Sequence, residues 1–331
     1  MRLLALLAAT LLMAAVACGS GEKSHGPASS SPPTRVCAGV SPCPEAKPSV
    51  VATSVLSARV RDISVASPAL GTTAQVRLLL PAHYVDHPSR RWPVLYLLHG
   101  CCDSYLSWTR STDVERVTAR NDVLVVMPEG GPVGFYSDWL NGPKWETFHL
   151  EELRGILVHD YRASAVMAIA GVSMGGLGAL DYAARHPGVF RAAASFSGIV
   201  NTRLTMAESQ RYEGLVRSQS ENPADLWGDP ADQASTWAAH NPYDLAGQLR
   251  GTSVFVAAGN GEPGHLDPPG TQPDSLESSL ARENATFLNR LHALNVPVVA
   301  DFYGAGTHNW PYWQRDLHRA WPLISHALGV G

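Results

Sequence analysis

One short stretch constrains the fold of this chain more than any other. The apolar run Val166–Ala170 leads into Gly171-Val-Ser-Met-Gly175, and helix-forming residues follow as far as Arg185. A chain that turns sharply from a strand into a helix needs small residues on either side of the turn. The stretch therefore predicts a strand–turn–helix unit that presents the hydroxyl of Ser173 at the carboxyl end of a strand.

The remainder of the chain repeats the alternation of strands and helices. From about residue 50, short β-branched runs alternate with helix-like stretches, and several runs are apolar at nearly every position. This pattern predicts a mainly parallel eight-stranded sheet with helices on both faces, as in the α/β-hydrolase fold. The expected strands are 58–65, 74–80, 94–98, 123–127, 166–170, 192–196, 253–257 and 298–302. The expected helices are 112–119, 147–161, 175–185, 275–294 and 313–328.

Length and composition suit one catalytic domain over residues 50–331. The chain has 331 residues, 45% of them apolar, which is enough for a single large core. Residues 201–250 form too long a connection for a simple crossover, so we expect irregular helices there, packed over the site as a cap or wall. The formal net charge is −4 without a basic stripe, which argues against nucleic acid as a partner.

The N-terminus resembles a secretion signal. A basic start and a short apolar run end at Ala15-Val-Ala-Cys18, which resembles a bacterial lipobox. Residues 1–18 are expected to be a signal peptide, with Cys18 as the lipidated residue of an anchor on the outer face of the cell membrane. A plain signal peptide of a secreted protein is the alternative. Residues 19–49, rich in Ser and Pro, are an expected linker, in which Cys37 and Cys43 are possible disulfide partners.

A serine hydroxyl needs a base, and in this fold the base follows the last strand. His308 lies on the Gly-rich loop after strand 298–302 and fits this role. The acid that orients it should follow strand 253–257. The carboxylates in that region are Glu262, Asp267, Asp274 and Glu277, and spacing alone does not choose among them.

The oxyanion hole of such an enzyme consists of two backbone N–H groups. The residue after the nucleophile, Met174, is expected to supply one. Cys101, after the strand end at His99-Gly100, is expected to supply the other. Cys101 and Cys102 either pair with each other or stay reduced. The five cysteines show no metal-ligand spacing, and the chemistry requires neither a metal nor an organic cofactor.

From about residue 92 to its end, the chain resembles the antigen 85 mycolyltransferases and their esterase D relatives. The resemblance depends on short sequence motifs that occur in the same order as in the family. They are Met127-Pro-Glu-Gly-Gly131, Phe135-Tyr-Ser-Asp-Trp139, Lys144-Trp-Glu-Thr-Phe148, Gly171-Val-Ser-Met-Gly175, Gly259-Asn-Gly261 and Gly306-Thr-His-Asn-Trp-Pro-Tyr-Trp313.

The resemblance implies roles that spacing leaves open. It selects Glu277 as the acid, with Glu262 as the second choice, and it places Trp310 in the acceptor pocket. The family reads Asp-Gly-Leu-Arg at the oxyanion loop, where Asp and Arg contact trehalose, whereas this chain has His99-Gly-Cys-Cys102. His99 therefore either replaces a substrate contact or is a structural hydrogen-bonding residue. Trehalose is not carried over as the acceptor.

Together these features predict an extracytoplasmic serine acyltransferase with carboxylesterase activity. It would act on acyl esters or lipids through an acyl-Ser173 intermediate, with an alcohol or water as acceptor. A plain carboxylic ester hydrolase is the first alternative. The second is a binding protein on the same fold, although the presence of Ser173, Glu277 and His308 together argues against it.

Overall fold

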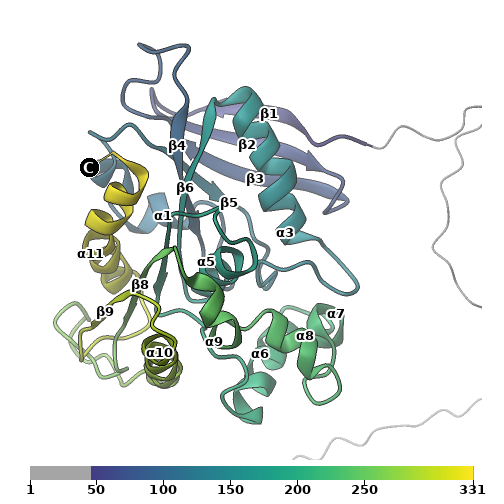
Figure 1. Cartoon of the computed structure of the whole chain (residues 1–331), viewed down its shortest axis with the longest axis vertical. Coiled ribbons are helices and arrows are strands. Elements are labelled where there is room, and N and C mark those ends of the chain that lie inside the picture. The colour runs from purple at the N-terminus through teal and green to yellow at the C-terminus, as the bar shows by residue number, and fades with distance from the viewer. Residues whose placement is uncertain (1–45, 331) are drawn as a thin grey trace, which may run out of the picture. The chain divides into compact units, whose positions relative to one another are not determined.

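The strands of the chain form one nine-stranded sheet within residues 46–330, the part that the computed structural model describes. Its order is β1-β2-β3-β5-β4-β6-β7-β8-β9 (Figure 1). The first three pairings in that order are antiparallel and the other five are parallel. The bounds are β1 Ser49–Val55, β2 Val60–Ser67, β3 Thr72–Leu79, β4 Trp92–Leu98, β5 Leu124–Pro128, β6 Ala163–Val172, β7 Ala192–Phe196, β8 Ser253–Ala258 and β9 Val298–Phe302.

The sheet has one strand more than expected. All eight predicted strands are present, and β1 is added at the edge, beginning at Ser49, which we expected to end the linker. Six of the seven residues of β1 are exposed, so no apolar alternation marks this strand in the sequence. The expected signal peptide, Cys18, the pair Cys37 and Cys43, and the linker up to residue 45 lie outside the described residues.

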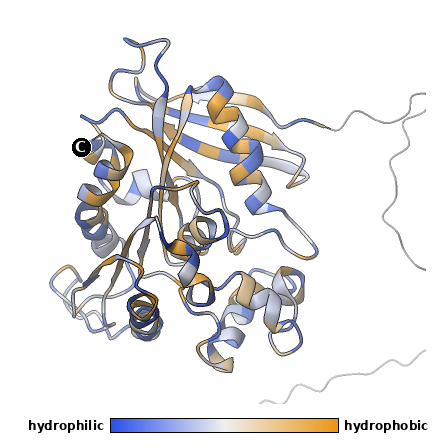
Figure 2. Ribbon diagram, in the orientation of Figure 1, coloured by the Kyte–Doolittle hydropathy of each residue, from blue (hydrophilic) through white to orange (hydrophobic). Residues whose placement is uncertain are grey.

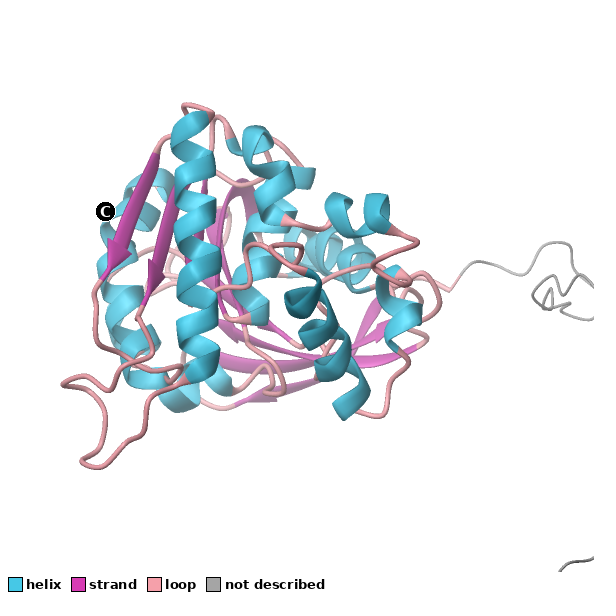
Figure 3. Cartoon of the chain, turned by 90° about the horizontal axis from the view of Figure 1, so that it is seen from below, coloured by secondary structure: helices cyan, strands magenta, loops and turns pink. Residues whose placement is uncertain are grey.

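Helices cover both faces of the sheet (Figure 3). Along β4, Val94 and Tyr96 enter the hydrophobic core on one face, while Leu95 and Leu97 enter the core on the other. This alternation follows from the two-residue repeat of a strand, and it explains why β4 is apolar throughout. The covering helices carry both orange and blue residues in Figure 2, as amphipathic helices do.

The helices agree with the prediction where their apolar repeat is regular. They are α1 Ser107–Ser111, α2 Val114–Val117, α3 Trp145–Thr147, α4 Arg154–Asp160, α5 Met174–Arg185, α6 Met206–Ser218, α7 Pro223–Trp227, α8 Ala234–Ala239, α9 Pro242–Leu245, α10 Ser275–Ala293 and α11 Trp310–Leu328. The helix expected at 147–161 is divided by a π-helical segment, η1 (Phe148–Leu153). The helix expected at 112–119 is replaced by the short α1 and α2, separated by an extended Thr112.

The segment 201–250 is mostly helical, as expected. It contains α6 to α9 and a 3-10 turn, η2 (Ala246–Leu249). Trp227 and Trp237 are fully buried in it, with ring centroids 5.1 Å apart. Among residues 46–330, no helix is both long and apolar enough to span a membrane.

Candidate active site

The predicted site residues gather at one edge of the sheet. The neighbouring parallel strands β4, β6, β7, β8 and β9 all end there, because parallel strands share their carboxyl edge. His99 follows β4 and Ser173 follows β6, while Gly259 follows β8 and His308 lies in the loop after β9. Ligands of open α/β sheets bind at this edge, so the topology places the predicted residues where a site is expected.

Ser173 occupies the sharp turn between β6 and α5. Its backbone has φ 55° and ψ −119°, a strained combination for a non-glycine residue. The Ser173 N–H donates to Phe196 O at 3.0 Å, which ties the turn to the end of β7. The side chain is only 8% exposed. The turn therefore holds one hydroxyl at the sheet edge at the start of a helix, as the sequence predicted.

The glycines around Ser173 are required by backbone contacts. A Cβ on Gly175 would lie 2.4 Å from Leu98 O and 2.6 Å from His99 O. A Cβ on Gly171 would lie 2.1 Å from Gly175 O. These neighbours are backbone carbonyl groups at the end of β4 and in the first turn of α5, which cannot rotate away, so both positions exclude a side chain.

The variant Gly175→Ala should separate the helix from the end of β4. We expect the free energy of unfolding to fall by about 1–3 kcal/mol, the usual cost of overpacking. Labelling of Ser173 by a fluorophosphonate should also slow, because the turn moves. Gly214→Ala is the matched control: this helical glycine has nothing within 4 Å of an added Cβ, and Ala should be neutral or stabilising by up to about 1 kcal/mol. Equal effects of the two substitutions in urea unfolding would contradict the argument.

A buried carboxylate and an imidazole form the centre of the arrangement. Glu277 is fully buried on the first turn of α10, and its Oε2 lies 2.7 Å from Nδ1 of His308. The other carboxylate oxygen, Oε1, accepts from the Gly259 N–H at 2.7 Å. Among the described residues, Nε2 of His308 makes no hydrogen bond. This ring nitrogen is therefore available to a hydroxyl group, which is the arrangement a general base needs.

The three other carboxylates considered from the sequence do not meet the imidazole. The Asp274 carboxylate caps α10 and also accepts from the backbone N–H of His308 at 2.9 Å. Asp267 accepts from the side chains of Thr307 and Asn309, the neighbours of His308. Glu262 is exposed, and its backbone carbonyl accepts from Gly306. Asp267 and Asp274 thus hold the loop that carries the base.

Sequence reasoning missed Ser197. This fully buried residue follows β7 directly, with φ 45°, and its hydroxyl donates to Glu277 Oε1 at 2.8 Å. The same hydroxyl accepts from Trp313 Nε1 at 3.2 Å, and the Trp313 ring lies 4.9 Å from the ring of His308. Its place at a strand end on the same sheet edge was the signal that could have revealed it.

Two backbone N–H groups near Ser173 are unpaired. Within residues 46–330, neither the N–H of Cys101 nor that of Met174 donates a hydrogen bond. Cys101 follows Gly100, where an added Cβ would lie 3.2 Å from the Cβ of Ser173. Unpaired donors on both sides of a serine are what an oxyanion hole requires.

The surroundings of His99 favour the structural alternative over a substrate contact. The side chain is only 1% exposed. Its Nε2 accepts from the Gly130 N–H and its Nδ1 lies 2.9 Å from Gly100 O, so both ring nitrogens are used within the fold. Trp310, in contrast, is partly exposed and lies edge-on to Trp108 and Trp313. Its role in an acceptor pocket stays a prediction.

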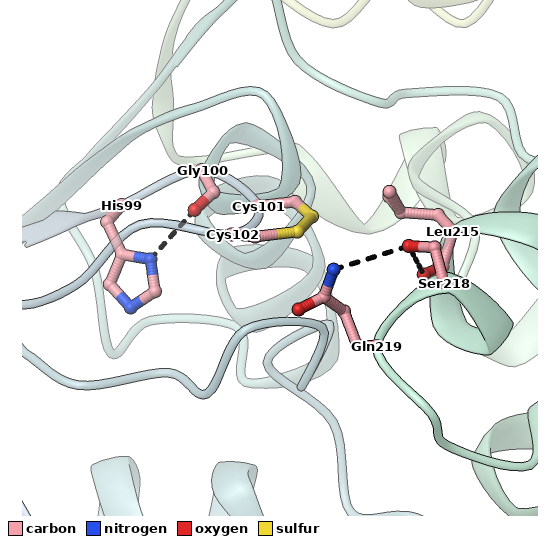
Figure 4. Close-up of a disulfide and its surroundings, with 7 residues drawn as sticks. All are labelled: His99, Gly100, Cys101, Cys102, Leu215, Ser218 and Gln219. Atoms are coloured by element: carbon pink, nitrogen blue, oxygen red, sulfur yellow. Dashed lines mark hydrogen bonds between the residues drawn. A yellow bond between two sulfur atoms is a disulfide. The ribbon is translucent and has the colours of Figure 1, made fainter.

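Cys101 and Cys102 pair with each other, which resolves the alternative left open by the sequence. Figure 4 shows this disulfide directly after the His99–Gly100 turn, with Leu215 and Ser218 of α6 and the following Gln219 among its surroundings. The oxyanion loop and the helical segment 201–250 therefore meet at the disulfide.

A separate Ser–His–Asp grouping joins α5 to the segment 201–250. His240 Nδ1 is 3.4 Å from Ser137 Oγ and 3.3 Å from Asp181 Oδ2. A proton relay needs different ring nitrogens for the hydroxyl and the carboxylate, whereas here one nitrogen faces both. All three residues are buried, and the His240 ring stacks on Trp227. This grouping is a structural network.

The same network contains a possible set of metal ligands. Ligand atoms of Glu146, Asp181 and His240 lie within 4.8 Å of one another. The guanidinium of Arg185 already lies 3.1 Å from Glu146 and 3.8 Å from Asp181. The positive charge beside the carboxylates of Glu146 and Asp181 is thus the side chain of Arg185, and we assign no metal ion here.

Glu283 makes the stability of this region dependent on pH. Burial raises its pKa from 4.5 to about 7, even though the carboxylate accepts hydrogen bonds from Tyr212 and from the backbone of Asn201 and Val200. The native state then holds a proton that the unfolded chain releases, so the free energy of unfolding should fall as pH rises from about 4.5 to 7. The expected contribution is up to about 3 kcal/mol.

Glu283→Gln tests this pH dependence, because the amide stays neutral. The free energy of unfolding, measured in urea across this pH range, should differ between wild type and variant, and the difference should change most between pH 4.5 and 7. Glu262→Gln, at an exposed position, should leave the profile unchanged. Parallel profiles for wild type and Glu283→Gln would show that Glu283 does not titrate there.

Comparison with known proteins places this chain among esterases and acyltransferases. The family model "Putative esterase" matches residues 67–324. The chain is 34% identical over 260 residues to the diacylglycerol acyltransferase/mycolyltransferase Ag85B of Mycolicibacterium smegmatis, covering 71% of this chain and 77% of that protein. It is 30% identical over 286 residues to Ag85A of Mycobacterium tuberculosis, covering 82% of each.

Solved structures agree on the fold. MPT51 (FbpC1) of Mycobacterium tuberculosis superposes with a TM-score of 0.69 at 25% identity, covering 82% of this chain and all of that one. FphF, a fluorophosphonate-binding serine hydrolase of Staphylococcus aureus, superposes with a TM-score of 0.63 at 20% identity, covering 80% of this chain and 96% of that one. The second likeness shows the fold alone.

Proposed function

This chain belongs to the esterase family of α/β-hydrolases that includes the antigen 85 mycolyltransferases, and from this premise we propose that it transfers acyl groups through Ser173. The proposed substrate is an acyl ester or lipid, and the proposed acceptor is an alcohol or water. The observation that carries the proposal is the contact of 2.7 Å between the buried Glu277 and His308, on the sheet edge that presents Ser173.

In the proposed cycle, His308 takes the proton of Ser173 as the hydroxyl attacks the ester carbonyl. Glu277 holds the imidazole in the tautomer that leaves Nε2 free and stabilises the imidazolium that forms. The N–H groups of Cys101 and Met174 donate to the developing oxyanion, and loss of one such donor typically costs about 100-fold to 1000-fold in kcat. The leaving alcohol takes the proton from His308. The acceptor then attacks acyl-Ser173, and His308 acts as base again.

We further propose that the reaction takes place outside the cytoplasm. The support is the sequence before the described residues, where a signal-like segment ends at Cys18 and a Ser/Pro-rich stretch follows. A lipid on Cys18 would keep the domain near membrane lipids, which suits acyl esters as substrates. Loss of membrane fractionation in Cys18→Ser, with secretion retained, would support the anchor.

An acyl-partition assay tests the proposal and separates transfer from hydrolysis. The full chain and its Ser173→Ala variant receive activated esters of short and long acyl groups, with trehalose, glycerol or diacylglycerol present or absent. Ser173-dependent acyl capture at the expense of free acid supports a transferase. Free acid in the same yield whatever acceptor is added supports a plain ester hydrolase.

A binding protein on the same fold is the competing class. It predicts no Ser173-dependent acyl release from any ester and no fluorophosphonate labelling. The buried Glu277 carboxylate contacts Ser197, Gly259 and His308. This favours the enzyme, because a binding protein has no use for a carboxylate held against an imidazole.

A further inference from the structure

We propose that the Cys101–Cys102 disulfide is a thiol-exchange site that controls the reactivity of Ser173. A dithiol reductant would open the disulfide and lower acyl transfer, and reoxidation would restore it. The inference rests on the proposed function, because its readout is turnover at Ser173. It adds a covalent modification site and names a dithiol as the class of molecule that acts on it.

The position of the disulfide carries the inference. The residues before it are held firmly: the Tyr136 hydroxyl donates to His99 O at 2.8 Å, and Gly130 N donates to the His99 ring at 2.9 Å. After it, Asp103 N donates to Gly100 O at 3.2 Å. Between these points, the N–H groups of Cys101 and Cys102 make no hydrogen bond within residues 46–330. The covalent link between the side chains therefore restrains this stretch, together with the packing of Cys101 against the hydrophobic core.

This stretch contains a proposed oxyanion donor. The Cys101 N–H comes directly after Gly100, which packs against the Cβ of Ser173. The disulfide joins the two cysteine side chains in one ring and so limits the backbone rotations of both residues. After reduction those rotations are free, and the orientation of the Cys101 N–H is no longer determined by the ring. The Cys101 N–H must already point at the position of the oxyanion before the reaction begins. Rotation of this peptide group therefore reduces the stabilisation of the oxyanion.

The disulfide is also open to attack. Cys102 is exposed, whereas Cys101 is half-buried against the hydrophobic core. A thiolate of the reductant attacks Sγ of Cys102, forming a mixed disulfide and releasing the Cys101 thiolate, which takes up a proton. The second thiol of the reductant then displaces Cys102 and closes its own disulfide. The protein gains two electrons and two protons, and the dithiol loses them.

Opening the disulfide should also affect its contact with the end of α6. Leu215 and Ser218, at the end of α6, and the following Gln219 lie among the surroundings of the disulfide in Figure 4. Opening the ring would therefore change the contact between the oxyanion loop and the end of α6. A change of this kind alters the fit of the acyl group as well as the oxyanion donor, so both kcat and KM should respond.

The test uses the full chain with Cys18→Ser, Cys37→Ser and Cys43→Ser, so that Cys101 and Cys102 are the remaining cysteines. Ester turnover and the number of maleimide-reactive thiols are measured across a dithiothreitol titration. Turnover should fall about 10-fold or more as two thiols appear together, and diamide should restore it. Adding Cys102→Ser, which prevents the disulfide, should give turnover that does not respond to dithiothreitol.

The outcomes separate this inference from the proposed function. If two thiols appear and turnover stays constant, the disulfide does not control Ser173, and the inference is wrong. The same follows if the variant with Cys102→Ser responds to dithiothreitol as strongly as the disulfide-bonded protein. If the oxidised protein shows no Ser173-dependent turnover with any ester, the proposed function has failed, and this inference fails with it.

Discussion

Ser173→Ala is expected to lower kcat for ester cleavage by at least about 10⁴-fold and to abolish labelling by a fluorophosphonate. The reason is that the hydroxyl of Ser173 is the proposed point of covalent attachment, and removal of a nucleophilic serine leaves only the catalysis due to the oxyanion hole and binding. The fold should be retained, because Ser173 keeps its place through its backbone contact with Phe196. Mass spectrometry of the labelled protein and steady-state hydrolysis of an activated ester measure both effects.

Ser137→Ala is the matched control. Ser137 is buried and lies near a histidine and an aspartate, as a catalytic serine would. It also accepts from Trp227 Nε1 at 2.8 Å, so its loss should affect stability more than turnover. If labelling persists in Ser173→Ala and disappears in Ser137→Ala, the reactive serine is Ser137, and the proposed site is overturned.

Glu277→Gln is expected to lower kcat by about 10³–10⁴-fold with a much smaller change in KM. The amide occupies the same volume, but it holds no negative charge beside the imidazolium and favours the wrong tautomer of His308. The effect should be largest on the chemical step, because Glu277 is fully buried behind His308.

Two other glutamates make this result specific. Glu283 is a second buried glutamate of α10, six residues after Glu277, and it contacts the loop at Val200 and Asn201 instead of His308. Glu262 was the second choice for the acid from the sequence. Glu283→Gln and Glu262→Gln should each retain kcat within about 10-fold of wild type at pH 7. A loss in Glu262→Gln equal to that in Glu277→Gln would show that the acid has been assigned to the wrong residue.

The choice of the carboxylate that orients His308 could not be made from spacing in the sequence. Four carboxylates follow β8 within a short span, and spacing did not distinguish Glu262, Asp267, Asp274 and Glu277. The fold distinguishes them by orientation: the first turn of α10 directs Glu277 inward, while the Asp274 carboxylate caps that turn and holds the backbone of His308. Resemblance to the antigen 85 family selected Glu277, and the geometry gives a physical reason for that choice.

The gaps in the sequence-based prediction have two causes. The edge strand β1 was missed because exposure on both faces removes the apolar alternation that marks a strand. The role of His99 as a structural residue depends on Gly130, which is distant in the sequence. Ser197 was missed because its partners, Glu277 and Trp313, are separated from it by about a quarter of the chain or more.

The sequence by itself determined the local features: the strand–turn–helix around Ser173, the buried parallel strands and the loop that carries His308. These depend on turn geometry and on apolar repeats, which neighbouring residues impose on one another. Tertiary structure decided which carboxylate meets the imidazole, whether the adjacent cysteines pair, and which N–H groups stay unpaired. Those outcomes depend on contacts between strand ends that only the order of strands in the sheet brings together.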